Sequence, residues 1–73
     1  MAQRIEIAIY TDYIQLDQLL KRANVVRSGG EAHVVVEEGL VSLNGEQESR
    51  KRAKIRPGDV VEFEDFIIEV KSM

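Results

Sequence analysis

The residues best suited to chemistry in this chain form one basic run near its C-terminal end. Residues 50–56 read Arg-Lys-Arg-Ala-Lys-Ile-Arg and hold five cations and no acid. Guanidinium groups bind phosphate through paired hydrogen bonds, and ammonium groups bind it as point charges. If the run is extended, Lys51, Ala53 and Ile55 point inward, and the remaining residues form one outward cationic face. The outward residues are Arg50, Arg52, Lys54 and Arg56.

A second candidate for phosphate binding lies around Gly29-Gly30, where a helix is expected to begin. Free backbone amides at a helix start attract anions. The chain has no Walker pattern and no Gly-x-Gly-x-x-Gly, which argues against a nucleotide site. A backbone phosphate needs only an amide or two and a cation, although the glycines could simply form the turn and the first helical turn. The two regions predict these phosphate-binding residues: Lys21, Arg22, Arg27, Ser28, Arg50, Lys51, Arg52 and Lys54.

Catalytic chemistry finds little support in the sequence. The chain has no cysteine, so thiol nucleophiles, disulfides and Cys-based zinc or iron–sulfur sites are excluded. His33 is the only histidine, and it is expected to be a surface or boundary residue. The serines lack the paired base that activates a hydroxyl. The sequence therefore predicts a protein that is not an enzyme and that has no catalytic residues, metal or cofactor.

Charge is unevenly distributed along the 73 residues, which we expect to form one domain over 1–73. The formal net charge of −3 argues against a general nucleic-acid binder. The basic run, however, precedes residues 59–69, which hold five acids and no cation. Such an arrangement predicts a polarised surface that the net charge conceals. The alternative is a pair of solvated faces that attract each other.

Composition also bears on where the protein works. The absence of cysteine in so short a chain favours the cytoplasm, because small secreted domains are usually stapled by disulfides. No apolar run is longer than four residues, whereas a membrane span needs about 20. The first ten residues alternate instead of forming the apolar block of a signal peptide. We therefore expect a cytoplasmic protein without a membrane partner.

The elements that position the basic residues follow from changes in the apolar period. Residues 4–10 alternate apolar and polar side chains, which predicts a half-buried strand. Residues 15–23 space their leucines as one helical stripe, and Asn24 suits a left-handed helix end. Ser28 and Glu31 fit a capping box for a second helix. Gly39 is placed to end that helix.

Short strands are predicted after the second helix. Asn44-Gly45 is a strong hairpin signal because both residues accept positive φ. The turn at Pro57-Gly58-Asp59 precedes alternation at Val61 and Phe63, and residues 66–70 form a last strand that could pair with the first. The predicted fold class is α+β, with two helices packed on a small antiparallel sheet.

Several short motifs follow one another in a fixed order. They are Leu16-Asp17-x-x-Leu20, Ser28-x-x-x-Ala32, Gly39-Leu40-Val41-x-Leu43-Asn44-Gly45 and Gly58-Asp59-x-Val61. In this order they resemble the S-four-like RNA-binding domain, named for a small-subunit ribosomal protein. Short stand-alone bacterial members resemble the chain most. In those members Tyr13-Ile14-x-Leu16 opens the first helix, and Glu48-x-Arg50-Lys51-Arg52-x-Lys54-Ile55 follows the hairpin. The resemblance implies the αL RNA-binding motif fold.

The resemblance also implies a function: binding of structured, ribosomal RNA by the two helices and the basic loop, with a link to ribosome assembly. A ribosomal or assembly protein could be a second partner, and we expect a monomer. Many family members carry arginine where this chain has Gln15 and Gly29, which shifts the binding to Arg27 and the 50–56 run. No aromatic residue lies in that run, so we expect RNA to be read through its backbone and shape.

Two other functions remain open at this point. A protein-interaction module could use the acidic strands or Val34, which points away from the apolar stripe of its helix. A ubiquitin-like sulfur carrier shares the Asn44-Gly45 hairpin, but such a carrier needs a C-terminal Gly-Gly. This chain ends in Lys71-Ser72-Met73.

Overall fold

The computed structural model describes residues 2–73, which form two helices and seven strands. The helices lie in the middle of the chain and most strands follow them, as the sequence predicts. The elements are β1 (Gln3–Ile9), β2 (Ile14–Gln15), α1 (Leu16–Arg22), α2 (Gly29–Glu37), β3 (Val41–Leu43), β4 (Glu46–Gln47), β5 (Lys54–Ile55), β6 (Val60–Phe63) and β7 (Phe66–Ser72).

The strands form a five-stranded sheet of order β1-β7-β6-β3-β4 and a separate two-stranded ladder of β2 and β5. The α+β class is confirmed, and so is the pairing of the first and last strands. That pairing is parallel, with Gln3 opposite Phe66, so the sheet is mixed and the expectation of an antiparallel sheet was wrong. Neighbouring hairpin strands must be antiparallel, but no short turn restricts the direction of β1 and β7, because the helices lie between them.

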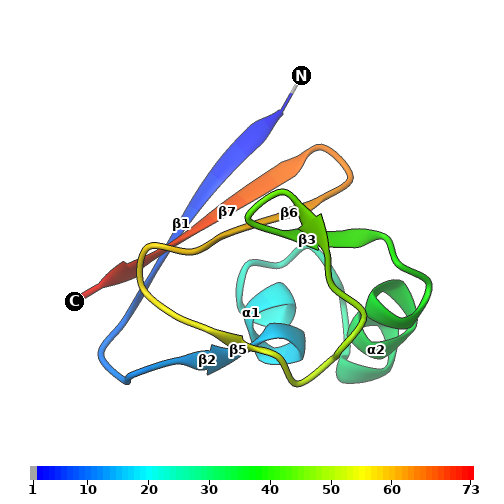
Figure 1. The fold of residues 1–73 in the computed structure, drawn as a ribbon, viewed down its shortest axis with the longest axis horizontal. Coiled ribbons are helices and arrows are strands. Elements are labelled where there is room, and N and C mark those ends of the chain that lie inside the picture. Colours follow the sequence, from blue (N-terminus) through cyan, green and yellow to red (C-terminus); the bar gives the residue numbers. More distant parts are fainter. Residues whose placement is uncertain (1) are drawn as a thin grey trace.

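The molecule has two layers (Figure 1). Both helices and the β2–β5 ladder lie on one side of the five-stranded sheet. The core between the layers is apolar: Leu16, Leu19 and Leu20 of α1 have no exposed surface, and Ile68 of β7 has none either. No polar or charged side chain is buried in residues 2–73. The charged residues therefore lie on the two outer faces, which the layers separate.

The helix boundaries agree with the signals in the sequence. At the start of α2, the Glu31 amide donates to Ser28 Oγ at 3.2 Å, which is one of the two hydrogen bonds of the predicted capping box. Asn24 after α1 and Gly39 after α2 have φ angles of 60° and 76°, the left-handed conformation that ends a helix. No helix in residues 2–73 has the length and apolar character needed to cross a membrane.

A polar contact joins the two turns predicted in the second half of the chain. Asn44 Nδ2 donates to Asp59 Oδ1 at 3.1 Å, and Asn44 Oδ1 accepts from the Val60 amide at 2.9 Å. Asp59 Oδ2 also accepts from the Arg56 amide at 2.8 Å. The β3–β4 hairpin and the turn before β6 therefore hold each other, and they fix the end of the basic run.

Candidate nucleic-acid interface

The basic run is attached to the beginning of α1 through its backbone. Gln15 at the N-terminal cap of α1 makes no side-chain hydrogen bond to the helix. The amides of Leu16 and Asp17 instead donate to the carbonyls of Ala53 and Lys51, both at 2.9 Å. These bonds satisfy amides that a helix start leaves without an intrahelical partner. The run is therefore a loop fitted to α1, and only Lys54–Ile55 is strand.

The side chains of the run point as the extended reading predicts. Ala53 and Ile55 are buried, Lys51 is half-buried, and the alternate cations are exposed. Ala53 and Ile55 both pack into the core, so Lys54 between them must point outward. The loop therefore presents its charges outward although it is mostly not a strand.

Two cations of the run already have carboxylate partners. Arg50 donates to Glu48 from Nε at 3.0 Å and from a terminal nitrogen at 3.1 Å, and its amide donates to the same carboxylate at 3.0 Å. The hydrogen bond from the Arg50 guanidinium holds the pKa of Glu48 below its ordinary value, against the opposing effect of burial. Lys51 Nζ lies 3.7 Å from Glu37 Oε1 of α2. Their charges are therefore partly compensated.

Three other cations of this segment form no ion pair within residues 2–73. They are Arg52, Lys54 and Arg56, and together with Arg50 and Ala53 they line an open hollow of about 400 Å³. Arg56 was not among the predicted binding residues, although its position in the alternation of the run is the same as that of Arg52 and Lys54. Converging unpaired cations around a concavity favour binding of an anion.

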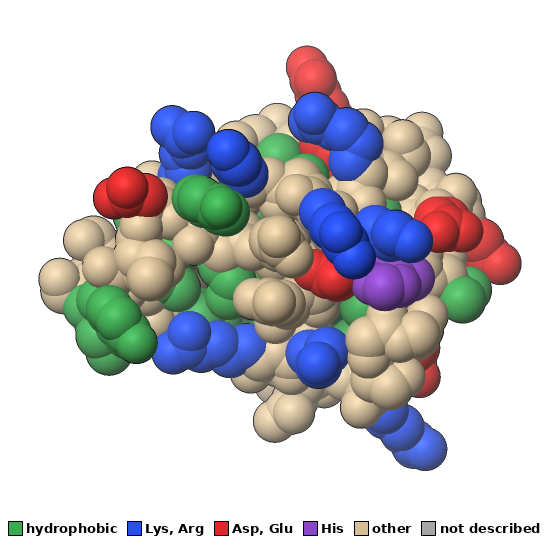
Figure 2. Space-filling model, turned by 90° about the horizontal axis from the view of Figure 1, so that it is seen from below, with side chains coloured by type: hydrophobic (Ala, Val, Ile, Leu, Met, Phe, Trp, Pro, Cys, Tyr) green, Lys and Arg blue, Asp and Glu red, His purple; other side chains and the backbone are tan. Residues whose placement is uncertain are grey.

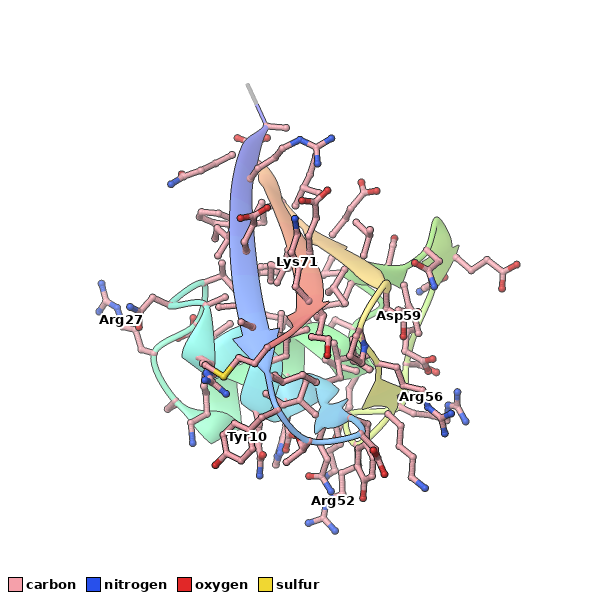
Figure 3. All side chains as sticks on the ribbon, turned by 90° about the vertical axis from the view of Figure 1, so that its left-hand side faces the viewer. Tyr10, Arg27, Arg52, Arg56, Asp59 and Lys71 are labelled. Atoms are coloured by element: carbon pink, nitrogen blue, oxygen red, sulfur yellow. The ribbon has the colours of Figure 1, made fainter. Side chains whose placement is uncertain are left out.

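The predicted cations of the helical region, Lys21, Arg22 and Arg27, do not all lie on the same side of the molecule. Lys21 and Arg22 are exposed in the last turn of α1. A Cβ atom on Gly29 would lie 3.9 Å from Lys21 Cδ, so Lys21 reaches the start of α2. Arg27 instead projects from the side of the molecule opposite Arg56 (Figure 3). Arg27 therefore does not share a site with the basic run.

The sole histidine lies between these groups. His33 Nε2 is 3.0 Å from Asp17 Oδ2, so a contact with α1 occupies it. On the outer side of the helical layer, Lys and Arg side chains lie next to it on one side, and acidic side chains are also close by (Figure 2). Ser28 Oγ likewise serves as a helix cap. Residues 2–73 contain no group of three or more side chains suited to hold a metal ion.

The outer face of the sheet has the opposite character. Glu6 and Glu69 are opposite each other on β1 and β7, and Glu62 and Glu64 are exposed. The cations of β1 and β7 are both engaged: Arg4 pairs with Glu69, and Lys71 Nζ lies 2.7 Å from Glu6. The polarised surface predicted from the charge blocks is therefore present, with unpaired cations on the helix and loop side.

The position of Val34 also agrees with the sequence. Its side chain is 52% exposed on α2, and Leu40 after that helix is equally exposed.

The last strand, β7, continues to Ser72, so the C-terminal segment is part of the sheet. This placement is unlike the free tail on which a sulfur carrier depends.

The fold belongs to a known class. Residues 7–71 match the family model described as the S4 domain, and the chain is a member of that family. The solution structure of YbcJ from E. coli, described as revealing an αL motif involved in RNA-binding, superimposes with a TM-score of 0.74 at 30% identity. The match covers 97% of this chain and 91% of that one.

Two bacterial relatives are similar in sequence. A Bacillus subtilis (strain 168) protein named "Probable ribosome maturation protein RlbA" is 45% identical over 60 residues, which is 82% of this chain and 84% of the relative. YbcJ of Escherichia coli (strain K12) is 36% identical over 58 residues, which is 80% of this chain and 83% of the relative. The family predicted from the ordered motifs is thereby confirmed.

Proposed function

We propose that this chain binds structured ribosomal RNA through the outer side of its helical layer and that it catalyses no reaction. The observation that carries the proposal is the attachment of the basic run to α1. The bonds from Leu16 and Asp17 fix the loop, and the loop holds the unpaired cations Arg52, Lys54 and Arg56 around one concavity. A loop whose backbone is already fixed binds phosphate without the cost of ordering that backbone. We call these three residues, with Lys21 and Arg22, the cationic surface.

The comparisons support this proposal. A similar structure is described by its αL motif involved in RNA-binding, and the relative RlbA is named for ribosome maturation. The acidic outer face of the sheet would repel a phosphate backbone and so orient the RNA on the helical side. We further propose that the protein acts in the cytoplasm during ribosome maturation, where a ribosomal or assembly protein could share the RNA.

Fluorescence anisotropy with a structured ribosomal RNA fragment across a salt series tests the proposal. Neutralising about four or five phosphates predicts a roughly 100-fold loss of affinity between 50 and 200 mM salt. The triple variant Arg52→Glu, Lys54→Glu, Arg56→Glu should abolish this binding. A salt-independent affinity, or full binding by the folded triple variant, would contradict the proposal.

The acidic face supplies the matched control. Glu62→Lys with Glu64→Lys changes exposed charges on the opposite layer and should leave specific RNA binding intact. If this double variant lost RNA binding while remaining folded, the interface would lie elsewhere. Circular dichroism and urea unfolding of each variant confirm folding before the affinities are compared.

A further inference from the structure

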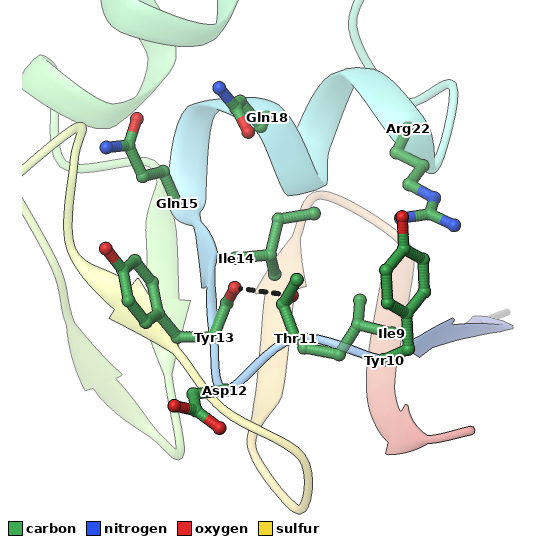
Figure 4. A pocket seen from close by; sticks show the side chains of 9 residues that line it. All are labelled: Ile9, Tyr10, Thr11, Asp12, Tyr13, Ile14, Gln15, Gln18 and Arg22. Carbon is green, nitrogen blue, oxygen red and sulfur yellow. Dashed lines mark hydrogen bonds between the residues drawn. The ribbon is translucent and has the colours of Figure 1, made fainter.

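A second hollow lies beside the cationic surface, between α1 and the loop that joins β1 to β2. Its volume is about 670 Å³, which is in the range of pockets that accept small organic ligands. Figure 4 shows tyrosine rings at its two ends and polar side chains reaching from α1 and its N-terminal cap. The lining residues that could contact a ligand include Tyr10, Tyr13, Gln15, Gln18 and Arg22.

The two tyrosines are unusually exposed for aromatic residues. Tyr10 is 82% exposed and Tyr13 is 39% exposed, so neither contributes a fully buried ring to the core. Their backbone positions are nonetheless fixed, because Ile9 and Ile14 on either side are buried. Thr11 Oγ1 also donates to the Tyr13 carbonyl at 2.9 Å. The backbone of the loop is therefore fixed while both rings stay accessible, which suits the stacking of a planar ligand.

Groups that recognise the edge of a planar heterocycle lie along the same hollow. The side-chain amides of Gln15 and Gln18 each offer a donor and an acceptor, as the edges of nucleobases require. Arg22 lines the hollow from the last turn of α1 and has a guanidinium suited to phosphate. Aromatic rings, amides and one cation together match a nucleotide better than a simple anion.

The hollow is continuous with the proposed RNA surface. Lys54 Nζ lies 5.0 Å from the centre of the Tyr13 ring, within the distance of a cation–π interaction. Lys54 also lines the hollow of the basic run, and Arg22 belongs to the cationic surface. A phosphate backbone that follows these cations therefore passes the opening between Tyr10 and α1.

We propose that this hollow receives one unpaired nucleotide of the bound RNA. The base stacks on Tyr10, the amide of Gln18 contacts its edge, and Arg22 holds its phosphate. This inference rests on the proposed function and deepens it, because it names the RNA feature that the protein selects: an unstacked base beside a helix. This site was not predicted from the sequence, because Tyr10 and Tyr13 lie outside the basic run.

The test compares two short hairpin RNAs that differ by one unpaired adenosine, which is replaced by a fluorescent adenine analogue in a second preparation. Tyr10→Ala and Tyr10→Phe are measured beside the parent by anisotropy. The exposure of Tyr10 makes both variants compatible with folding. We expect Tyr10→Ala to lower affinity for the hairpin with the unpaired base roughly fivefold or more. It should leave the fully paired hairpin unaffected, and Tyr10→Phe should bind as the parent does.

The fluorescence of the adenine analogue should fall when the parent binds and should not fall with Tyr10→Ala. Equal loss of affinity for both hairpins, or no loss for either, would overturn the nucleotide site while leaving salt-sensitive RNA binding in place. If the parent bound neither hairpin at low salt, the proposed function itself would fail, and the nucleotide site with it. Binding of the paired hairpin thus distinguishes failure of the nucleotide site from failure of RNA binding itself.

Discussion

His33 of α2 and Asp17 of α1 contact each other directly, with 3.0 Å between Nε2 and Oδ2. Both side chains are partly covered, at 33% and 14% exposure. Asp17 Oδ1 also accepts from the Gln18 amide, and the Asp17 amide donates to the Lys51 carbonyl. Asp17 therefore joins both helices and the basic loop, so the shape of the cationic surface depends on it.

The His33–Asp17 contact should contribute measurably to stability. We expect His33→Ala and Asp17→Ala each to lower the free energy of unfolding, with a coupling of about 1 kcal/mol between them. Urea unfolding of the two single variants and the double variant gives that coupling. Strictly additive effects would show that the two side chains do not interact in solution.

Arg50 and Arg52 should differ in their importance for RNA binding, although they are two residues apart. Arg52→Gln should reduce the salt slope of binding by about 0.7–0.9, as expected for the loss of one phosphate contact. Arg50→Gln should reduce it less, because Glu48 already holds the Arg50 guanidinium. Anisotropy at several salt concentrations gives both slopes. An equal or larger effect of Arg50→Gln would contradict the role assigned to Glu48.

The pairing of Glu48 with Arg50 also predicts a dependence on pH. The folded-state pKa of Glu48 is lowered from an ordinary value of 4.5, mainly by the Arg50 hydrogen bond. The contribution of the Glu48–Arg50 ion pair to the stability of the folded state is therefore fully present above pH 4.5. It disappears as the pH falls through the lowered pKa of Glu48. Arg50→Gln should return the pKa of Glu48 toward its ordinary value. An NMR titration of the side-chain carboxyl measures this, and an unchanged pKa would refute the pairing.

Gly29 offers a position at which binding could be strengthened. A Cβ atom there meets only Lys21 Cδ, at the ordinary contact distance of 3.9 Å, and the position lies in the first turn of α2. Gly29→Arg should make the salt slope steeper by about 0.7–0.9, because one more phosphate is neutralised. Gly29→Gln serves as the uncharged control. A slope identical to that of the parent would place the start of α2 outside the interface.

The sequence predicted most of the elements because their signals are local. The leucine stripe and the Ser28 cap are visible within a few residues, and they correspond to α1 and α2. The parallel pairing of β1 with β7 was not predictable, since a contact between distant segments sets it. The charge of the 50–56 run was plain, but its attachment to α1 through the Ala53 carbonyl depends on three-dimensional packing.

The candidate site was predicted only in part for the same reason. Partners from other elements, such as Glu37 for Lys51, cannot be read from spacing along the chain. Arg56 could have been included, because it has the same phase in the run as Arg52. The hollow beside Tyr10 is formed by a loop and a helix. The spacing of apolar residues predicts each element by itself but not how the two lie against each other.

The most direct test of the central claim is an NMR titration of the isotope-labelled protein with a structured ribosomal RNA fragment. Amide signals of α1, of the start of α2 and of residues 49–56 should shift on binding, while those of Glu6, Glu62 and Glu69 on the outer sheet face should stay in place. Shifts confined to the outer sheet face, or no shifts at low salt, would contradict RNA binding by the cationic surface.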